Sequence, residues 1–278
     1  GIYGLLAVGL VLVYKGTRAL NFAQGELGTF GLYIAWVFTH DDRMPWFVGA
    51  LAAMAIVGLI GWLFERFVVR NMIQASRLAV AVATIGLFFL LFSIEIKVWG
   101  VSPKVVAPPL EGLGPKLAGF HVSPTYMLAF AAVAIMGVAL AAFLRKTDFG
   151  LGVVAASQDP VAVRLMGIPL NKVSSFTWVT ASVIGVIAGL LIEPSIGAFA
   201  PGFMTPLFVN GLAAALLGGL TSLPGAFLGG AAIGVLESLV KYFFLGSLFP
   251  GISVLAVFMV IITVLLLRPQ GILGKAEA

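Results

Sequence analysis

Long uninterrupted apolar runs alternate along the chain with short clusters that hold nearly all of its charge. A helix needs about 20 apolar residues to cross a bilayer, whereas the strands of a membrane barrel appear as alternating segments of about 10 residues. The pattern therefore predicts an all-α fold, a polytopic transmembrane helical bundle of about eight or nine membrane segments. The runs fall at 1–14, 22–38, 46–64, 78–97, 125–144, 173–192, 205–219, 226–244 and 251–267.

Composition supports a protein whose main solvent is lipid. Of 278 residues, 61% are hydrophobic and 10% are charged, against about 25% charged in a soluble domain. The segments leave about 100 residues for all loops, so we expect one transmembrane domain over 1–278. The run 1–14 is short and Gly1 is not an initiator methionine, so we expect missing N-terminal residues. The segment 205–219 is short and Gly-rich, and a re-entrant half-helix is an alternative to a full crossing there.

The distribution of basic residues predicts the orientation. Lys and Arg accumulate in cytoplasmic loops of membrane proteins, and eleven of the sixteen lie on one set of alternating loops. This places the C-terminus and the loop 145–172 in the cytoplasm, and the Pro-rich stretch 101–124 outside, where a rigid cap on the bundle is favoured over a docking surface. The net charge of +5 then reports topology, and no nucleic-acid partner is expected.

Catalytic chemistry has little support in the sequence. The chain has no Cys and two His, which argues against thiolate or histidine metal sites. Phosphate-binding, nucleophile-elbow, zincin and dinucleotide-binding motifs are absent from suitable contexts. We expect a non-enzymatic chain that binds no cofactor. Three carboxylates in or near the spans are predicted to occupy surface positions near helix ends: Glu95, Glu193 and Glu237. Glu95 lies beside Lys97, and Glu237 lies four residues before Lys241.

Glu26 belongs to a polar segment, 21–28, that enters the second apolar run. Two interpretations remain open. Asn21 caps a helix whose positive end favours the Glu26 carboxylate, or the helix start is loosely wound and its polar groups line a pathway or gate. The candidate pathway residues are Asn21, Gln24 and Glu26, joined by Thr84 from the segment 83–87, which combines a small residue, a hydroxyl and a glycine.

The predicted cytoplasmic loop contains one short helix over about 158–168. Asp159 before Pro160 is typical of a helix start, and Gly167 before Pro169 is typical of its end. Such a helix either docks into a groove of a partner protein or rests on the bilayer surface. Helical spacing places three apolar side chains on one face: Val161, Leu165 and Ile168.

These segments resemble the permease subunits of bacterial branched-chain amino acid ABC importers, the Liv type. The resemblance covers nearly the whole chain. It rests on Asn-Phe-Ala-Gln-Gly-Glu at 21–26, Ala-Thr-Ile-Gly-Leu at 83–87, the loop segment 158–168, the Gly-rich run 218–230 and Arg-Pro-Gln-Gly at 268–271. Family members commonly have Arg where this chain has Val154 and a third Gly where it has Thr221. The first departure puts a salt bridge to the ATPase in doubt.

The resemblance implies a set of partners and a division of labour. A second homologous permease subunit, two ATP-binding ATPase subunits and an external, periplasmic solute-binding protein would join this chain in the lipid of the bacterial inner membrane. ATP would bind only to the partner subunits. The loop helix would be the coupling helix to the ATPase, which the resemblance assigns to four positions: Gln158, Asp159, Arg164 and Gly167.

The solute is not determined by the sequence. Branched-chain amino acids are the family default, and a largely apolar path with scattered hydroxyls and amides suits small neutral or zwitterionic solutes. Related permeases serve urea, short amides or other small organic molecules, which stay open as alternatives. An ion-coupled secondary transporter and a membrane scaffold are the competing classes.

Overall fold

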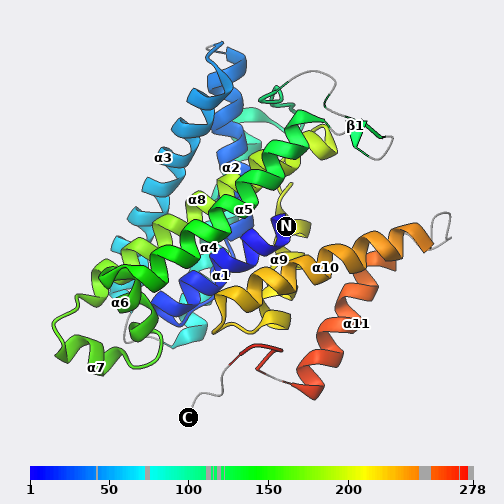
Figure 1. Cartoon of the computed structure of the whole chain (residues 1–278). Helices are drawn as coiled ribbons and strands as arrows, with labels where there is room; N and C mark the ends of the chain where they lie inside the picture. Colours follow the sequence, from blue (N-terminus) through cyan, green and yellow to red (C-terminus); the bar gives the residue numbers. More distant parts are fainter. Residues whose placement is uncertain are drawn as a thin grey trace.

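The computed structural model describes residues 1–41, 43–72, 76–110, 114, 116–117, 120–121, 123–243, 252–268 and 270–274. Helices dominate this part of the chain, and each of the nine predicted apolar runs forms one (Figure 1). The all-α, polytopic fold is confirmed. The helices of the nine runs are α1 Ile2–Thr17, α2 Gln24–Trp36, α3 Trp46–Phe64, α4 Arg77–Trp99, α5 Pro124–Lys146, α8 Leu170–Ile196, α9 Thr205–Gly218, α10 Leu223–Phe243 and α11 Ile252–Leu267.

Five helical stretches in the described residues are long and apolar enough to cross a membrane; they correspond to α3, α4, α5, α8 and α10. Helices α1, α9 and α11 are apolar but shorter. The 14 residues of α9 extend about 21 Å at 1.5 Å per residue, less than the roughly 30 Å of a hydrocarbon core. Helix α2 continues directly into a π-helical turn, Val37–Asp41, which lengthens it.

Two ends of the bundle can be distinguished (Figure 1). The short helices α6, Asp148–Ala156, and α7, Pro160–Leu165, lie at the end called here the α7 end. The small hairpin of β1, Lys116–Leu117, and β2, Phe120–His121, lies at the opposite end, the β1 end. Helices α3 and α8 both extend from one of these ends to the other (Figure 1).

Helix α8 lies at the centre of the bundle and packs closely on α2. It is the most buried of the five long spans in the described residues. A Cβ atom on Gly28 of α2 would lie 2.7 Å from the carbonyl oxygen of Gly185 on α8. Helices in lipid associate through such small residues, because close backbone approach increases van der Waals contact. The α2–α8 interface therefore requires glycine at this position.

The described part of the Pro-rich stretch caps the β1 end, as predicted. The backbones of Lys104 and Phe199 exchange hydrogen bonds of 2.8 and 2.9 Å. The N–H group of Val106 donates to Oε1 of Glu193 over 3.1 Å. These contacts fasten the stretch to the last turn of α8 and to the segment that follows it. Parts of the predicted loop, including 111–113, lie outside the described residues.

Two of the three predictions for the other carboxylates are wrong. Glu95 and Glu193 are buried rather than at the surface, because segments distant in sequence cover the ends of α4 and α8. Among the described residues, Glu95 forms no ion pair with Lys97. The prediction for Glu237 is closer, since its carboxylate pairs with Lys241 at 2.6 Å and that lysine is largely exposed.

Candidate functional site

Helix α2 begins inside the bundle, after a buried segment that is not helical. Arg18 ends α1 in the left-handed conformation, with φ 56°, and α2 starts only at Gln24. The backbone between them is satisfied by side chains: Phe22 N–H donates to Oγ1 of Thr84 over 3.1 Å, and Ala23 N–H donates to Oδ1 of Asn21 over 3.0 Å. Irregular backbone at membrane depth is tolerated only where it is satisfied in this way.

Gln24 fastens the start of α2 to its neighbours. Its Nε2 donates to the carbonyl oxygen of Ala181 on α8 over 2.6 Å, and its Oε1 accepts from Nδ2 of Asn21 over 3.3 Å. Asn21, Gln24 and Thr84 are all fully buried. The structure thus brings three of the four predicted pathway residues together around the unwound segment 18–23, called here the unwound entry.

Glu26 lies one turn further along α2 and faces a different element. Its Oε1 accepts from the N–H group of Gly202 over 3.2 Å. One turn later, Oγ1 of Thr29 accepts from the N–H group of Met204 over 3.1 Å. The carboxyl group of Glu95 on α4 lies beside that of Glu26. Glu26 therefore fixes the turn before α9 against α2 and does not contribute to the unwound entry.

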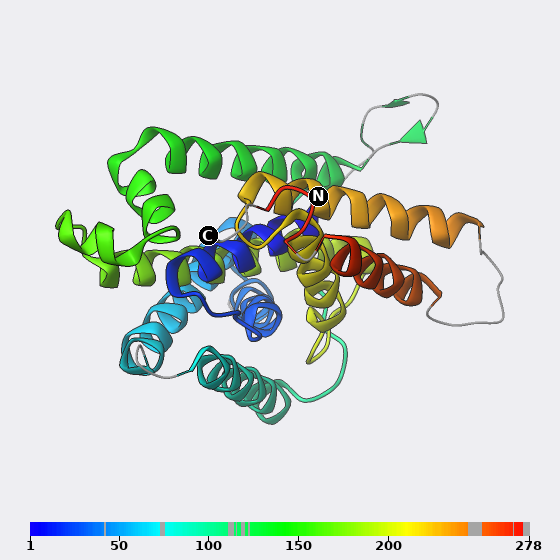
Figure 2. The ribbon, with the colours of Figure 1, turned by 90° about the horizontal axis from the view of Figure 1, so that it is seen from below.

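A groove with a volume of about 2090 Å³ runs over α1 between α5 and α10. Figure 2 shows these three helices as neighbours. The lining is largely apolar. Near the α7 end it includes the polar groups of Lys15, Arg18 and Ser157. Further along, it includes Tyr3 on the N-terminal part of α1 and Glu237 on α10. The four predicted pathway residues are not among the lining residues, so in this conformation they lie behind the groove wall.

Ser157 joins the unwound entry to the loop 145–172. It ends α6, and its Oγ accepts from Nζ of Lys15 over 3.1 Å. Its carbonyl oxygen accepts from Nη2 of Arg18 over 2.5 Å. Arg18 is the residue at which α1 ends and the unwound entry begins. Sequence reasoning missed Ser157, because nothing near position 157 indicates a partner some 140 residues earlier.

Helix α7 has the predicted caps. Oδ1 of Asp159 accepts from the N–H group of Ala162 over 2.9 Å. Gly167 adopts φ +81°, and Ile168 N–H bonds back to the carbonyl oxygen of Val163 over 3.2 Å. A left-handed glycine of this kind is a common helix end. The two capping residues, Asp159 and Gly167, are exposed at the α7 end, and so are Gln158 and Arg164.

The prediction that Val161, Leu165 and Ile168 share one apolar face of this helix is wrong in part. Val163 points into the bundle, where it packs near Leu12 and Val173, and Ile168 packs against the same cluster. Leu165 is 84% exposed and points away from the bundle, because α6 and the start of α8 contact the other side of α7. The side chain of Val161 lies outside the described residues. Leu165 and Met166 therefore form an exposed apolar tip on the loop.

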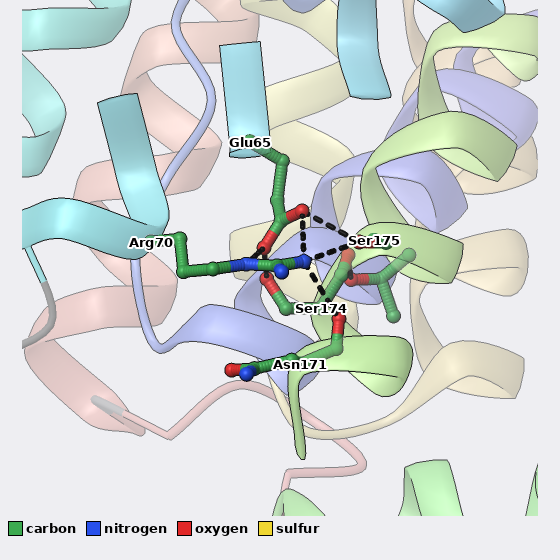
Figure 3. Close-up of polar contacts among 6 residues, drawn as sticks. Glu65, Arg70, Asn171, Ser174 and Ser175 are labelled. Atoms are coloured by element: carbon green, nitrogen blue, oxygen red, sulfur yellow. Dashed lines mark hydrogen bonds and ion pairs between the residues drawn. The ribbon is translucent and has the colours of Figure 1, made fainter. Parts of the chain in front are cut away.

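A buried ionic network ties α3 to α8 directly after this loop (Figure 3). Glu65, in a π-helical turn Glu65–Val69 at the end of α3, is fully buried and pairs with Nη2 of Arg70 at 3.0 Å. The hydroxyl groups of Ser174 and Ser175 on α8 donate to the two oxygens of Glu65 over 2.8 and 2.6 Å. Arg70 also donates to the carbonyl oxygen of Asn171 over 3.3 Å.

This network was missed from the sequence. Glu65 and Arg70 lie in a charge cluster between two apolar runs, and such clusters are typical of solvated loops. The pair of serines at 174 and 175 was the available signal, since two adjacent hydroxyl groups at the start of an apolar helix can satisfy a buried carboxylate. The network holds the end of α3 against the residues where the loop returns to the bundle.

These features define a multi-pass helical membrane protein with a capped, exposed helix on one end and a groove along one side. Comparison with known proteins gives the family. The family model described as "Branched-chain amino acid transport system / permease component" matches residues 1–267, and the chain belongs to this family.

Curated relatives match over nearly their full length. The chain is 30% identical to the high-affinity branched-chain amino acid transport system permease protein LivH of Salmonella typhimurium, over 99% of this chain and 92% of the relative. It is 29% identical to BraD of Pseudomonas aeruginosa, a permease protein of the same description, with the same coverage. A probable LivH of Methanocaldococcus jannaschii is 27% identical over 97% and 88%. No solved structure matches the chain significantly.

Proposed function

We propose that this chain is a membrane-spanning permease subunit of an ATP-binding-cassette importer for branched-chain amino acids. The observation that carries the proposal is the family match over 1–267, supported by relatives whose names specify that transport. The bundle fits the role, since a largely apolar groove runs along one side of it. ATP would bind to separate subunits, and this chain would bind no cofactor.

The groove between α5 and α10 is proposed as this chain's half of the passage. It is open along one side of the bundle, so a second, homologous permease subunit would close it. An apolar wall with polar groups toward its ends matches a zwitterion with a branched aliphatic side chain, because each part of the solute meets a surface of its own kind. Alternating access would expose the passage to one side of the membrane at a time.

The loop helix is proposed to dock on the ATPase subunit. Gln158, Asp159, Arg164 and Gly167 present polar groups and backbone beside the apolar tip of Leu165 and Met166. Exposed apolar side chains rimmed by polar groups are typical of protein interaction sites. With this docking, the α7 end and the C-terminus would lie in the cytoplasm, and the β1 end would be left for the external binding protein.

The unwound entry is proposed as the gate that responds to this docking. Asn21, Gln24 and Thr84 are buried and hydrogen-bonded here, and Glu26 is held by Gly202. Ser157 connects the loop to Arg18, the first residue of the entry. A displacement of α7 would act on that hydrogen bond, and the entry can rearrange because it is held by the separate side chains of Asn21, Gln24 on α2 and Thr84 on α4 rather than by helical backbone bonds.

The coupling step is tested in the assembled complex with the solute-loaded binding protein. Gly167→Ala strains a backbone that has φ +81° by about 1–2 kcal/mol, and Leu165→Ala removes the apolar tip. Both variants should insert normally and lower solute-stimulated ATP hydrolysis. Leu255→Ala on α11, also an exposed apolar residue, is the matched control and should leave stimulation unchanged. Unchanged stimulation in both loop variants would contradict the docking assignment.

A second candidate is an ion-coupled secondary transporter, which the buried carboxyl groups of Glu26 and Glu95 favour, because intramembrane carboxylates mark ion and proton pathways. It predicts uptake by the purified chain under an ion gradient without ATP. A different solute, such as urea or a short amide, is the alternative within the ABC class. Ligand binding by the partner binding protein distinguishes these solutes.

A further inference from the structure

Two carboxyl groups meet in the interior of the bundle without a basic partner. Glu26 on α2 and Glu95 on α4 are both fully buried, and their carboxyl groups lie close enough to interact with each other. In the part of the chain that the structure describes, neither forms an ion pair with a Lys, Arg or His. Two ionised carboxylates cannot share such a site, because like charges repel strongly where water is excluded.

The hydrogen-bond donors near the pair are unequally distributed. Glu26 receives the N–H group of Gly202 on Oε1. The Gly202 N–H group also lies near the Glu95 carboxyl group, but neither oxygen of Glu95 has a hydrogen bond of good geometry to the described residues, and Oε2 of Glu26 is also without one. A hydrogen bond stabilises the charged form of a carboxylate. Glu26 is therefore the better site for a single negative charge, and Glu95 is the better site for a proton.

A buried tyrosine completes the surroundings. The hydroxyl group of Tyr33 on α2 is buried with no hydrogen-bond partner among the described residues, and it lies close enough to both carboxyl groups to interact electrostatically. Its ring stacks on Trp99 with centroids 4.8 Å apart and meets Phe199 edge-on. These aromatic rings keep the surroundings apolar. Two further titratable groups lie at this end of α8 and are engaged elsewhere: Glu193 accepts from Val106, and the ammonium group of Lys104 lies over the ring of Trp36, 4.9 Å from its centroid.

We propose that Glu26 and Glu95 form a proton-binding site in which one proton is shared between the two carboxyl groups. The O–H group of Glu95 donates to Oε2 of Glu26, and the single remaining charge is stabilised by Gly202. A shared proton satisfies atoms that are otherwise without a partner, and it halves the charge buried in the membrane.

The proton also has a structural role. It joins α4 to α2, while Glu26 joins α2 to the turn before α9. Loss of the proton would place two negative charges in contact and separate α4 from that turn. The site is a property of the bundle itself, so it holds or fails independently of which solute the complex transports.

Infrared spectroscopy of the full chain in lipid nanodiscs tests the proposal, because a protonated carboxyl group has a carbonyl stretch separate from that of a carboxylate. We expect a protonated-glutamate band at neutral pH, assigned by ¹³C-glutamate labelling and lost in Glu95→Gln. In Glu26→Gln the band should persist at a shifted frequency, because Glu95 stays buried while its O–H group loses the charged acceptor. Glu237→Gln is the matched control: its carboxylate pairs with Lys241, so the band should persist.

Three results would overturn the proposal: no protonated-glutamate band in the wild-type chain at neutral pH, a band that survives Glu95→Gln, or a band that appears only when sodium and potassium are removed. The last result would assign the site to a monovalent cation. A titration of the wild-type chain decides the matter even if a variant fails to fold, since the band must disappear in a single step as the pH is raised.

Discussion

The ammonium group of Lys15 lies 3.1 Å from the hydroxyl oxygen of Ser157, although 142 residues separate them in the sequence. Lys15 belongs to the last turn of α1, and Ser157 lies between α6 and the loop helix α7. Together with the bond from Arg18 to the Ser157 carbonyl, this contact makes the end of α1 a direct neighbour of the loop. Movement of the loop can therefore reach the unwound entry through Ser157, beside the packing of Leu12 on Val163.

Ser157→Ala should weaken coupling while leaving the fold intact. The substitution removes the hydroxyl that accepts from Lys15, and one hydrogen bond contributes about 0.5–1.5 kcal/mol, which corresponds to roughly a 2- to 10-fold change. We expect solute-stimulated ATP hydrolysis by the complex to fall within that range. Thr263→Ala on α11 is the control, because that hydroxyl bonds only within its own helix. An equal effect of both variants would argue against a specific role for Ser157.

Glu65→Gln should destabilise the bundle at the α7 end. The substitution leaves the Arg70 guanidinium without its charge partner, and breaking a buried pair costs about 3–5 kcal/mol. Arg70 is 17% exposed, so solvent reduces the expected loss to about 1–3 kcal/mol. The measurement is thermal unfolding of the purified chain in detergent.

The Glu237–Lys241 pair supplies the comparison for that measurement. Lys241 is 63% exposed, and an exposed pair at this helical spacing contributes about 0.3–0.5 kcal/mol. Lys241→Ala should therefore change the midpoint of unfolding little. If the two variants unfold alike, the network around Glu65 does not hold α3 to α8.

Gly28→Ala should disrupt the packing of α2 on α8. The added methyl group would lie 2.7 Å from the backbone oxygen of Gly185, and two helix backbones would have to separate, at a cost of about 1–3 kcal/mol. Gly86→Ala in α4 is the matched control, since no atom lies within 4 Å of the added carbon and alanine favours a helix by about 1 kcal/mol. The fraction of chain that stays monodisperse after heating in detergent should fall only for Gly28→Ala.

The helices could be predicted from the sequence because lipid imposes a simple rule. Apolar runs near the length of a membrane crossing and a few charged loops locate each span, and the caps of α7 at Asp159 and Gly167 follow from local backbone chemistry. Both kinds of signal are contained within a short stretch of chain, so no knowledge of distant contacts is required.

The buried carboxylates could not be predicted, because their partners come from distant segments. Glu95 meets Glu26 from another helix, Glu193 accepts from Val106, and Glu65 depends on serines more than 100 residues away. From their positions near helix ends alone, Glu95 and Glu193 were predicted to lie at the surface. Likewise, the inward face of α7 depends on how α6 and α8 pack around Val163, which spacing along one short helix does not specify.

Transport by the reconstituted complex decides whether the chain is a permease subunit powered by ATP. The chain would be assembled in proteoliposomes with a second permease, the ATPase subunits and the binding protein, and uptake of labelled leucine would be measured with and without ATP on the side of the α7 end. We expect uptake only with ATP and all partners, and none by the chain alone under a proton or sodium gradient. Gradient-driven uptake by the purified chain without ATP would contradict it.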